Sequence, residues 1–78
     1  MIDLIPLQLL RAGDSGEVVE ITGKPESVHR LEEMGLRSGV AVEVVQGGSP
    51  CIVKVAGHSY GLRADDVLQV LVRLRTPA

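Results

Sequence analysis

A histidine and two glutamates lie within the segment SVHRLEE. If this segment is helical, His29 is four residues from Glu33 and three from Glu32, so either pair presents two side chains on one face. Divalent first-row transition metals accept imidazole and carboxylate ligands. A third ligand has to come from elsewhere in the chain, and Glu26 is the nearest candidate. The same spacing is also typical of a solvated helix face, and the sequence favours that interpretation.

Two more residues have side chains that can bind metals, Cys51 and His58. Cys51 is in phase with Val53 and Val55 in an alternating segment, which predicts a buried thiol in a strand, because free cysteine is commonly buried. His58 follows Gly57, and this dipeptide predicts a two-residue hairpin turn. No cofactor is required, and Fe²⁺ or another divalent transition metal is the ion that such side chains would suit. The candidate metal ligands are His29, Glu32, Glu33, Cys51 and His58.

Adjacent carboxylates occur twice, at Glu32–Glu33 and at Asp65–Asp66. Paired carboxylates support general acid–base chemistry when their environments separate their pKa values. Neighbouring residues on a helix point in different directions, so neither pair is expected to converge. No serine–histidine–aspartate arrangement is evident, and the glycine-rich segments lack the lysine and hydroxyl residue of a phosphate-binding loop. We therefore expect no enzymatic activity.

The composition predicts one small domain with a core of valine, leucine, isoleucine and alanine. The chain has 78 residues, the length of a single domain over residues 1–78, with a core at about 4–73. Tyr60 is the only aromatic residue, and the net charge of −2 comes from both signs scattered along the chain. Nucleic-acid binding needs a clustered basic face or aromatic residues that stack on bases, so no nucleic-acid partner is expected.

The single cysteine excludes an intramolecular disulfide, so the fold does not depend on an oxidising compartment. The N-terminal segment MIDLIPLQLLRAGD is apolar, but it is too short to span a membrane and is interrupted by Pro6. It also lacks the charged start and the cleavage site of a signal peptide. We therefore expect a cytoplasmic protein that is not itself inserted in a membrane.

The residues discussed above have to be positioned by short strands and one good helix. A helix is predicted over Ser27–Met34, with Ser27 as its N-cap and Gly35 as the left-handed residue that ends it. A shorter N-terminal helix is predicted at Ile5–Leu10. Alternating apolar residues predict five strands, at Glu17–Thr22, Val40–Gln46, Cys51–Val55, Ser59–Arg63 and Val67–Leu74. Five short strands in so small a chain predict a mainly β fold, a closed or nearly closed barrel with the helix Ser27–Met34 capping one end.

Three motifs and their order carry a resemblance to a known family. They are RLxxMGLxxG at Arg30–Gly39, GSPC at Gly48–Cys51 and LR at Leu62–Arg63. The chain resembles the FeoA family over nearly its whole length, from about Leu4 to Val72. The resemblance implies a five-stranded SH3-like barrel, related to the C-terminal domain of metal-dependent repressors of the DtxR type.

The resemblance also implies a function. FeoA proteins are accessory factors of ferrous iron transport, so the chain is expected to dock on FeoB, a membrane iron transporter with a cytoplasmic G domain, and to modulate it. The expected surface is the helix Ser27–Leu36 with the facing loop Gln46–Pro50. The alternative is a transition-metal-binding or metal-sensing domain, similar to the barrel of the DtxR-type repressors. The expected partner-binding residues are Arg30, Glu33, Met34, Leu36, Arg37, Gly48 and Ser49.

Overall fold

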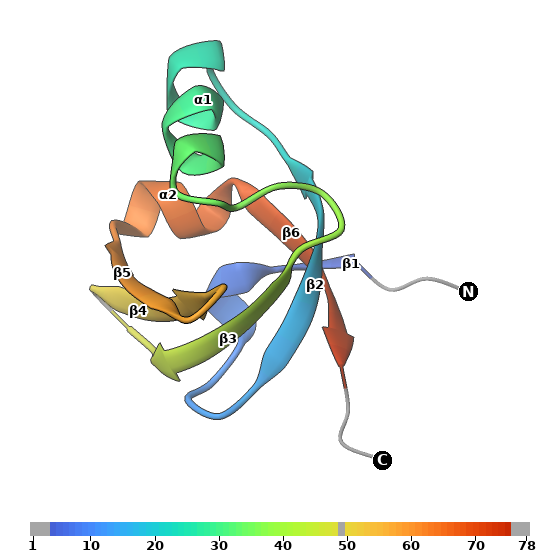
Figure 1. Ribbon diagram of the computed structural model, residues 1–78, viewed down its shortest axis with the longest axis vertical. Helices are drawn as coiled ribbons and strands as arrows, with labels where there is room; N and C mark the ends of the chain where they lie inside the picture. The colour runs from blue at the N-terminus through green and yellow to red at the C-terminus, as the bar shows by residue number, and fades with distance from the viewer. Residues whose placement is uncertain (1–3, 49, 76–78) are drawn as a thin grey trace.

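The protein folds around one antiparallel β-sheet that is covered by short helices (Figure 1). The computed structural model describes residues 4–48 and 50–75. Its strands are β1 (Leu4–Pro6), β2 (Ser15–Ile21), β3 (Ala41–Gln46), β4 (Cys51–Val55), β5 (His58–Leu62) and β6 (Val70–Arg75). Its helices are the 3-10 helix η1 (Leu7–Leu9) and the α-helices α1 (Pro25–Glu33) and α2 (Ala64–Leu68). The predicted mainly β fold with one helix over the end of the sheet is confirmed, with a sixth strand added.

The strands follow the order β1-β6-β2-β3-β4-β5, and every neighbouring pair is antiparallel. β6 therefore lies between β1 and β2, which joins the end of the chain to its beginning. The sheet curls into a half-open barrel, as Figure 1 shows, with α1 beyond one end and α2 on the link from β5 to β6. β1 and β5 remain edge strands that do not pair with each other in the part of the chain described. The sheet is therefore not closed, in contrast to the predicted closed or nearly closed barrel.

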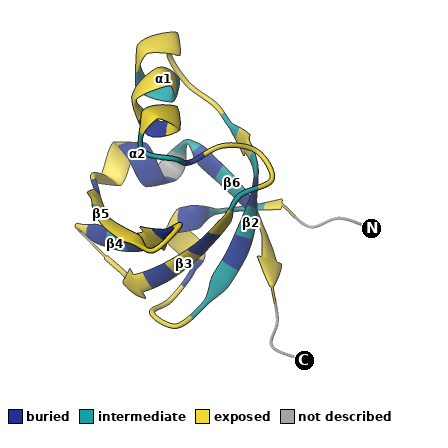
Figure 2. Ribbon diagram, in the orientation of Figure 1, coloured by how far each residue is buried: buried dark blue, intermediate teal, exposed yellow. Residues whose placement is uncertain are grey.

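The inner side of the curled sheet is a core of aliphatic residues (Figure 2). Buried valines alternate with exposed or half-buried residues along β3 and β4, which buries one face of each strand. Asp66 is the one charged residue that is buried among those described, at 7% exposure. The buried apolar residues are Leu7, Leu10, Val18, Leu31, Leu36, Val42, Val44, Cys51, Val53, Val55, Leu62, Val67, Val70 and Val72.

The N-terminal segment departs from the predicted helix Ile5–Leu10. Leu4–Pro6 instead forms β1, which pairs with β6. Pro6 is tolerated there because an edge strand does not need every backbone N–H for pairing. The helical part is reduced to the single turn η1, which buries Leu7. A strand of three residues shows no alternation, so its pairing with the distant β6 leaves no pattern in the local sequence.

Helix α1 begins two residues before the predicted cap at Ser27. Pro25 occupies the first helical position, and Lys24 precedes it as an N-cap that makes no side-chain hydrogen bond. Proline suits this position because its φ is already helical and its missing N–H would have no partner in the first turn. Consequently the first-turn amides of α1 have no side-chain acceptor from the N-cap.

The predicted glycine stop of α1 is confirmed. Gly35 has a φ of +98°. Its N–H donates to the carbonyl of Glu32 over 3.0 Å, and the N–H of Leu36 donates to the carbonyl of Leu31 over 3.1 Å. These two bonds form a Schellman motif, which places the following apolar residue against the helix. Leu31 and Leu36 are both completely buried, so the motif also directs the chain into the core before β3.

The turn between β4 and β5 is Ala56-Gly57 rather than the predicted Gly57-His58. Val55 pairs with His58 across the hairpin, which leaves two residues in the loop. Ala56 and Gly57 have φ values of +51° and +84°, as a type I′ turn requires. This turn matches the right-handed twist of the flanking strands, and that twist decides the register.

The segment after β5 also differs from the prediction of a turn at Ala64–Asp66 followed by a strand at Val67–Leu74. Residues 64–68 form α2, with two aspartates in its first turn, and β6 begins only at Val70. Acidic side chains favour the positive end of a helix, which supports a helix here. Val70 and Val72 share the buried face of β6. Within residues 4–48 and 50–75, no helix has the length and apolar character needed to cross a bilayer.

Candidate functional site

The outer face of α1 holds two of the candidate metal ligands side by side. His29 Nε2 lies 2.7 Å from Glu33 Oε1, and the two side chains are 73% and 65% exposed. Glu32 is exposed as well. In residues 4–48 and 50–75 no group of three histidine, cysteine, aspartate or glutamate side chains is placed to hold a metal ion. This face therefore brings together two ligands from one helical turn.

The other two candidate ligands lie apart. Cys51 is 3% exposed and opposes Leu62, whereas His58 is exposed and opposes Val55 at the other end of the same hairpin. Burial raises the pKa of the Cys51 thiol above its ordinary value of 9.0. A raised pKa disfavours the thiolate, which is the form that binds metals. Cys51 therefore has the environment of a core residue, as its phase with the neighbouring valines predicts.

The predicted partner-binding residues on the helix have unequal access. Arg30, Glu33 and Arg37 are exposed on α1 or just after it, and Met34 is half-buried against the core. Leu36 is completely buried, so its side chain supports the helix end and is not available to a partner. Figure 2 shows that α1 is exposed over most of its surface. The accessible part of this face is therefore charged.

The loop Gln46–Pro50 does not face α1. Helix α1 leads to the start of β3 and the loop follows its end (Figure 1), so a six-residue strand of roughly 20 Å separates them. Gly48 instead lines a small hollow with Gln8 and Cys51. Ser49 lies outside the described residues. The helix and the loop thus do not form one continuous surface.

A cleft of about 440 Å³ lies between α1, α2 and the segment that precedes α1. Three basic residues line it, Lys24, Arg30 and Arg63, together with the two aspartates Asp65 and Asp66. The lining thus carries three positive and two negative side chains, a surplus of one positive charge in a chain whose net charge is −2. Of the predicted partner-binding residues, Arg30 is the one that lines this cleft.

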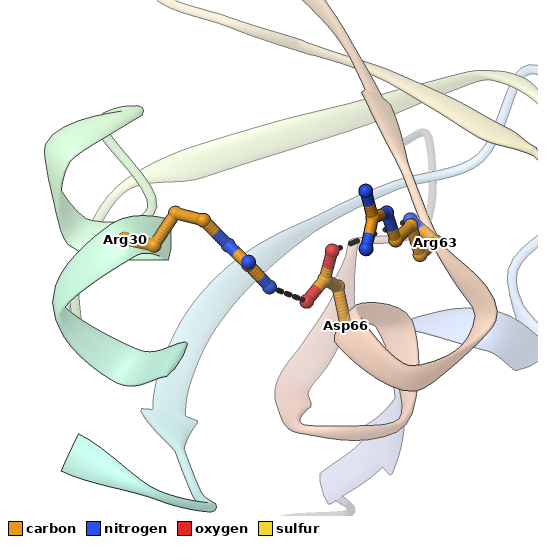
Figure 3. Close-up of polar contacts among 3 residues, drawn as sticks. All are labelled: Arg30, Arg63 and Asp66. Carbon is orange, nitrogen blue, oxygen red and sulfur yellow. Dashed lines mark hydrogen bonds and ion pairs between the residues drawn. The ribbon is translucent and has the colours of Figure 1, made fainter. Parts of the chain in front are cut away.

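An ion pair joins the two helices across the cleft. Arg30 Nη2 donates to Asp66 Oδ1 over 2.8 Å, and Figure 3 shows the arginine reaching from α1 to the aspartate on α2. The Arg63 backbone N–H approaches the second carboxylate oxygen of Asp66 at 3.4 Å. The Arg30 side chain is 54% exposed, but that of Asp66 is only 9% exposed. The buried carboxylate is therefore satisfied mainly by Arg30, and their contact joins α1 to α2.

A second contact at the cleft involves Gly23 and Gln69, which both line it. Gly23 has a φ of +115°, and a Cβ placed there would lie 2.8 Å from the side-chain amide of Gln69. The Gln69 side-chain oxygen is buried without a hydrogen-bond partner among the described residues. The Thr22 N–H donates to the Gln69 carbonyl over 2.8 Å, so the backbone is also joined here. Glycine at this position therefore allows the end of β2 to pack directly against the start of β6.

Sequence reasoning missed this cleft. Asp66 lies 36 residues from Arg30, and no local pattern pairs them. The prediction that Asp65 and Asp66 do not converge is correct, because Asp65 is exposed and Asp66 is buried. Their unequal environments follow from α2, which the sequence did not predict.

Together these features define a small SH3-like domain that presents a charged helix and a basic cleft. Residues 5–74 match the sequence profile of the family described as FeoA domain. The chain belongs to the FeoA family. No curated protein matches the chain by sequence.

Solved structures support the same assignment. The crystal structure of an iron uptake regulatory protein, FeoA, is 29% identical and has a TM-score of 0.88, covering 94% of this chain and all of that one. Stenotrophomonas maltophilia FeoA, a prokaryotic SH3 domain protein complexed with zinc, is 27% identical with a TM-score of 0.78, covering 87% of this chain and 88% of that one. A manganese-dependent transcriptional repressor has the same fold at 16% identity, with a TM-score of 0.87 over 96% of this chain and 44% of the repressor. The predicted relation to the barrel of metal-dependent repressors is therefore confirmed at the level of the fold.

Proposed function

We propose that the chain is a non-enzymatic accessory protein of ferrous iron uptake that works in the cytoplasm, where it docks on the cytoplasmic part of a FeoB-type membrane transporter and modulates it. The observation that carries the proposal is the family match over residues 5–74. The S. maltophilia relative supports it, because that protein is described as a candidate ferrous iron transport activating factor. In this proposal residues 4–73 act as one docking domain.

The proposed contact surface is the outer side of α1. Leu31 is the one residue of this helix that is buried, so most of the helix is available to a partner. Glu33 and Arg37 are both exposed and carry opposite charges at its C-terminal end. Charged groups at the rim of an interface favour the correct partner and orientation more than they raise the affinity. We therefore expect a specific interaction of moderate strength.

Calorimetric titration with the soluble cytoplasmic domain of the transporter from the same organism tests this proposal. The wild-type chain should bind saturably, and the double charge reversal Glu33→Lys/Arg37→Glu should weaken binding. Lys54→Glu is the control, because Lys54 is exposed on the sheet away from α1. An absence of binding by the wild-type chain, with unchanged iron uptake after deletion of its gene, would refute the proposal.

One observation favours metal binding as a second candidate function, the contact of His29 with Glu33 over 2.7 Å. Such a pair can supply two ligands to Fe²⁺, Mn²⁺ or Zn²⁺, with water or a partner supplying the others. This candidate predicts binding of one of these ions that His29→Ala abolishes. If none of them produces heat on titration into the metal-free protein, the candidate is eliminated.

A further inference from the structure

The cleft between α1 and α2 presents hydrogen-bond donors that have no partner within the described residues. Lys24 and Arg63 make no side-chain ion pair or hydrogen bond there, in contrast to Arg30. Ser27 adds a hydroxyl at the same wall. The N-cap Lys24 makes no side-chain hydrogen bond to the first turn of α1, so the N–H groups of Glu26 and Ser27 have no side-chain acceptor from the N-cap. The available groups at this wall are therefore cationic or donors.

Most hydrogen-bond acceptors of the cleft are already bonded or are buried. Asp66 is buried and bound to Arg30. The side-chain oxygen of Gln69 is buried against Gly23. Asp65 is the acidic side chain that remains exposed. The charge left for a ligand to meet is thus positive, from Lys24 and Arg63 against one aspartate.

We propose that this cleft binds an acidic segment of a partner protein, whose carboxylates pair with Lys24 and Arg63. Carboxylates match these groups, because hydrogen bonds between ionised partners are stronger than neutral ones and arginine binds carboxylate in a forked geometry. The volume of about 440 Å³ is in the range of ligand sites and accommodates several side chains rather than a single small anion. The identity of the partner as the transporter rests on the proposed function. The acidic character of the bound segment is inferred from the cleft alone.

Attraction to an acidic segment has to be local, because the whole chain carries a net charge of −2. Exposed ion pairs are screened by salt over about 8 Å at physiological ionic strength. Binding should therefore weaken markedly as salt is added, although the protein itself is mildly acidic.

The test is an NMR titration of the isotope-labelled full chain with a capped hexapeptide of alternating aspartate and glutamate. The amides of Lys24, Ser27 and Arg63 should shift saturably. The uncharged peptide of alternating asparagine and glutamine should shift none of them. Equal saturation by the uncharged peptide, or tighter binding of inorganic phosphate than of the acidic peptide, would overturn the proposal.

Two double variants distinguish binding in the cleft from a general effect of the protein's net charge. Lys24→Gln/Arg63→Gln should weaken peptide binding about tenfold, because two charged hydrogen-bond donors are lost. Lys54→Gln/Arg75→Gln removes the same charge from exposed positions on the sheet and should leave binding within about twofold of wild type. Equal weakening in both double variants contradicts a site in the cleft. If Lys24→Gln/Arg63→Gln unfolds, Lys24→Gln alone decides the matter, since that side chain is exposed and makes no ion pair or hydrogen bond within residues 4–48 and 50–75.

Titrating both double variants with the soluble transporter domain distinguishes this inference from the proposed function. Weaker binding by the cleft variant alone supports both. Equal binding by wild type and the cleft variant leaves the transporter as partner but refutes the cleft as its binding site. Binding of the acidic peptide without any binding of the transporter domain supports the cleft and refutes the proposed partner.

Discussion

Replacing Asp66 by alanine should destabilise the protein by about 1.5 kcal/mol, because the carboxylate that joins α1 to α2 is lost. A hydrogen bond to a charged group contributes about 1.5–3 kcal/mol. The contact with Arg30 is short, at 2.8 Å, but the arginine side chain is 54% exposed and solvent replaces part of it. The contact from the Arg63 backbone, at 3.4 Å, is too long to add much. The lower end of the range therefore applies.

Urea unfolding followed by far-ultraviolet circular dichroism measures this change, because Tyr60 as the one aromatic residue gives a poor fluorescence signal. In a domain of this size about 1.5 kcal/mol lowers the melting temperature by roughly 6–12 °C. Arg30→Met completes a double-mutant cycle, in which the coupling free energy between Arg30 and Asp66 should be about 1 kcal/mol. Asp65→Ala is the control, and as an exposed position it should change stability by less than about 0.5 kcal/mol.

Additive effects of the two substitutions would show that Arg30 and Asp66 are not energetically coupled. If the coupling free energy is below about 0.3 kcal/mol, the ion pair does not hold the helices together in solution. The cleft would then lack a fixed width, and the arrangement of Lys24 and Arg63 on its walls would no longer be defined.

Three further predictions concern single positions. Gly23→Ala should lower the free energy of unfolding in urea by about 1 kcal/mol or more, because a side chain is disfavoured at a φ of +115° and would meet Gln69. Stability equal to that of wild type would contradict the packing of Gly23 against Gln69. Ala56→Asn should raise the free energy of unfolding by about 0.5 kcal/mol, because asparagine adopts the left-handed conformation more readily than alanine, and a loss of stability would exclude the type I′ turn. Burial raises the pKa of the Cys51 thiol above 9.0, so the unfolded chain loses that proton at a lower pH than the folded protein. Wild type should therefore lose stability relative to Cys51→Val as pH rises above about 9. Parallel pH profiles of stability for the two proteins would show that the thiol is not buried.

The sequence predicted the elements whose signals are local. The alternation of Val42 and Val44 and of Val53 and Val55 identified β3 and β4 and their buried faces. Gly35 identified the end of α1, because a left-handed residue at a helix end strongly favours glycine. In both cases the residue type and the neighbouring residues determine the conformation.

Elements that depend on distant partners were missed. β1 has three residues and exists because β6 pairs with it, and α2 has five residues, which is too short to show helical periodicity. The contact between Arg30 and Asp66 joins positions that are far apart in the chain. The cleft depends on α2 and on this contact, so the sequence could predict the exposed helix but not the site beside it.

NMR mapping of the isotope-labelled chain, with the soluble cytoplasmic domain of the transporter as ligand, tests whether α1 and the cleft form the docking surface. We expect saturable shifts at α1 and at the walls of the cleft, including Arg30 and Lys24, while the outer face of β3 and β4 stays unchanged. Shifts confined to that sheet face, or no shifts at saturating concentrations of the transporter domain, would contradict this expectation.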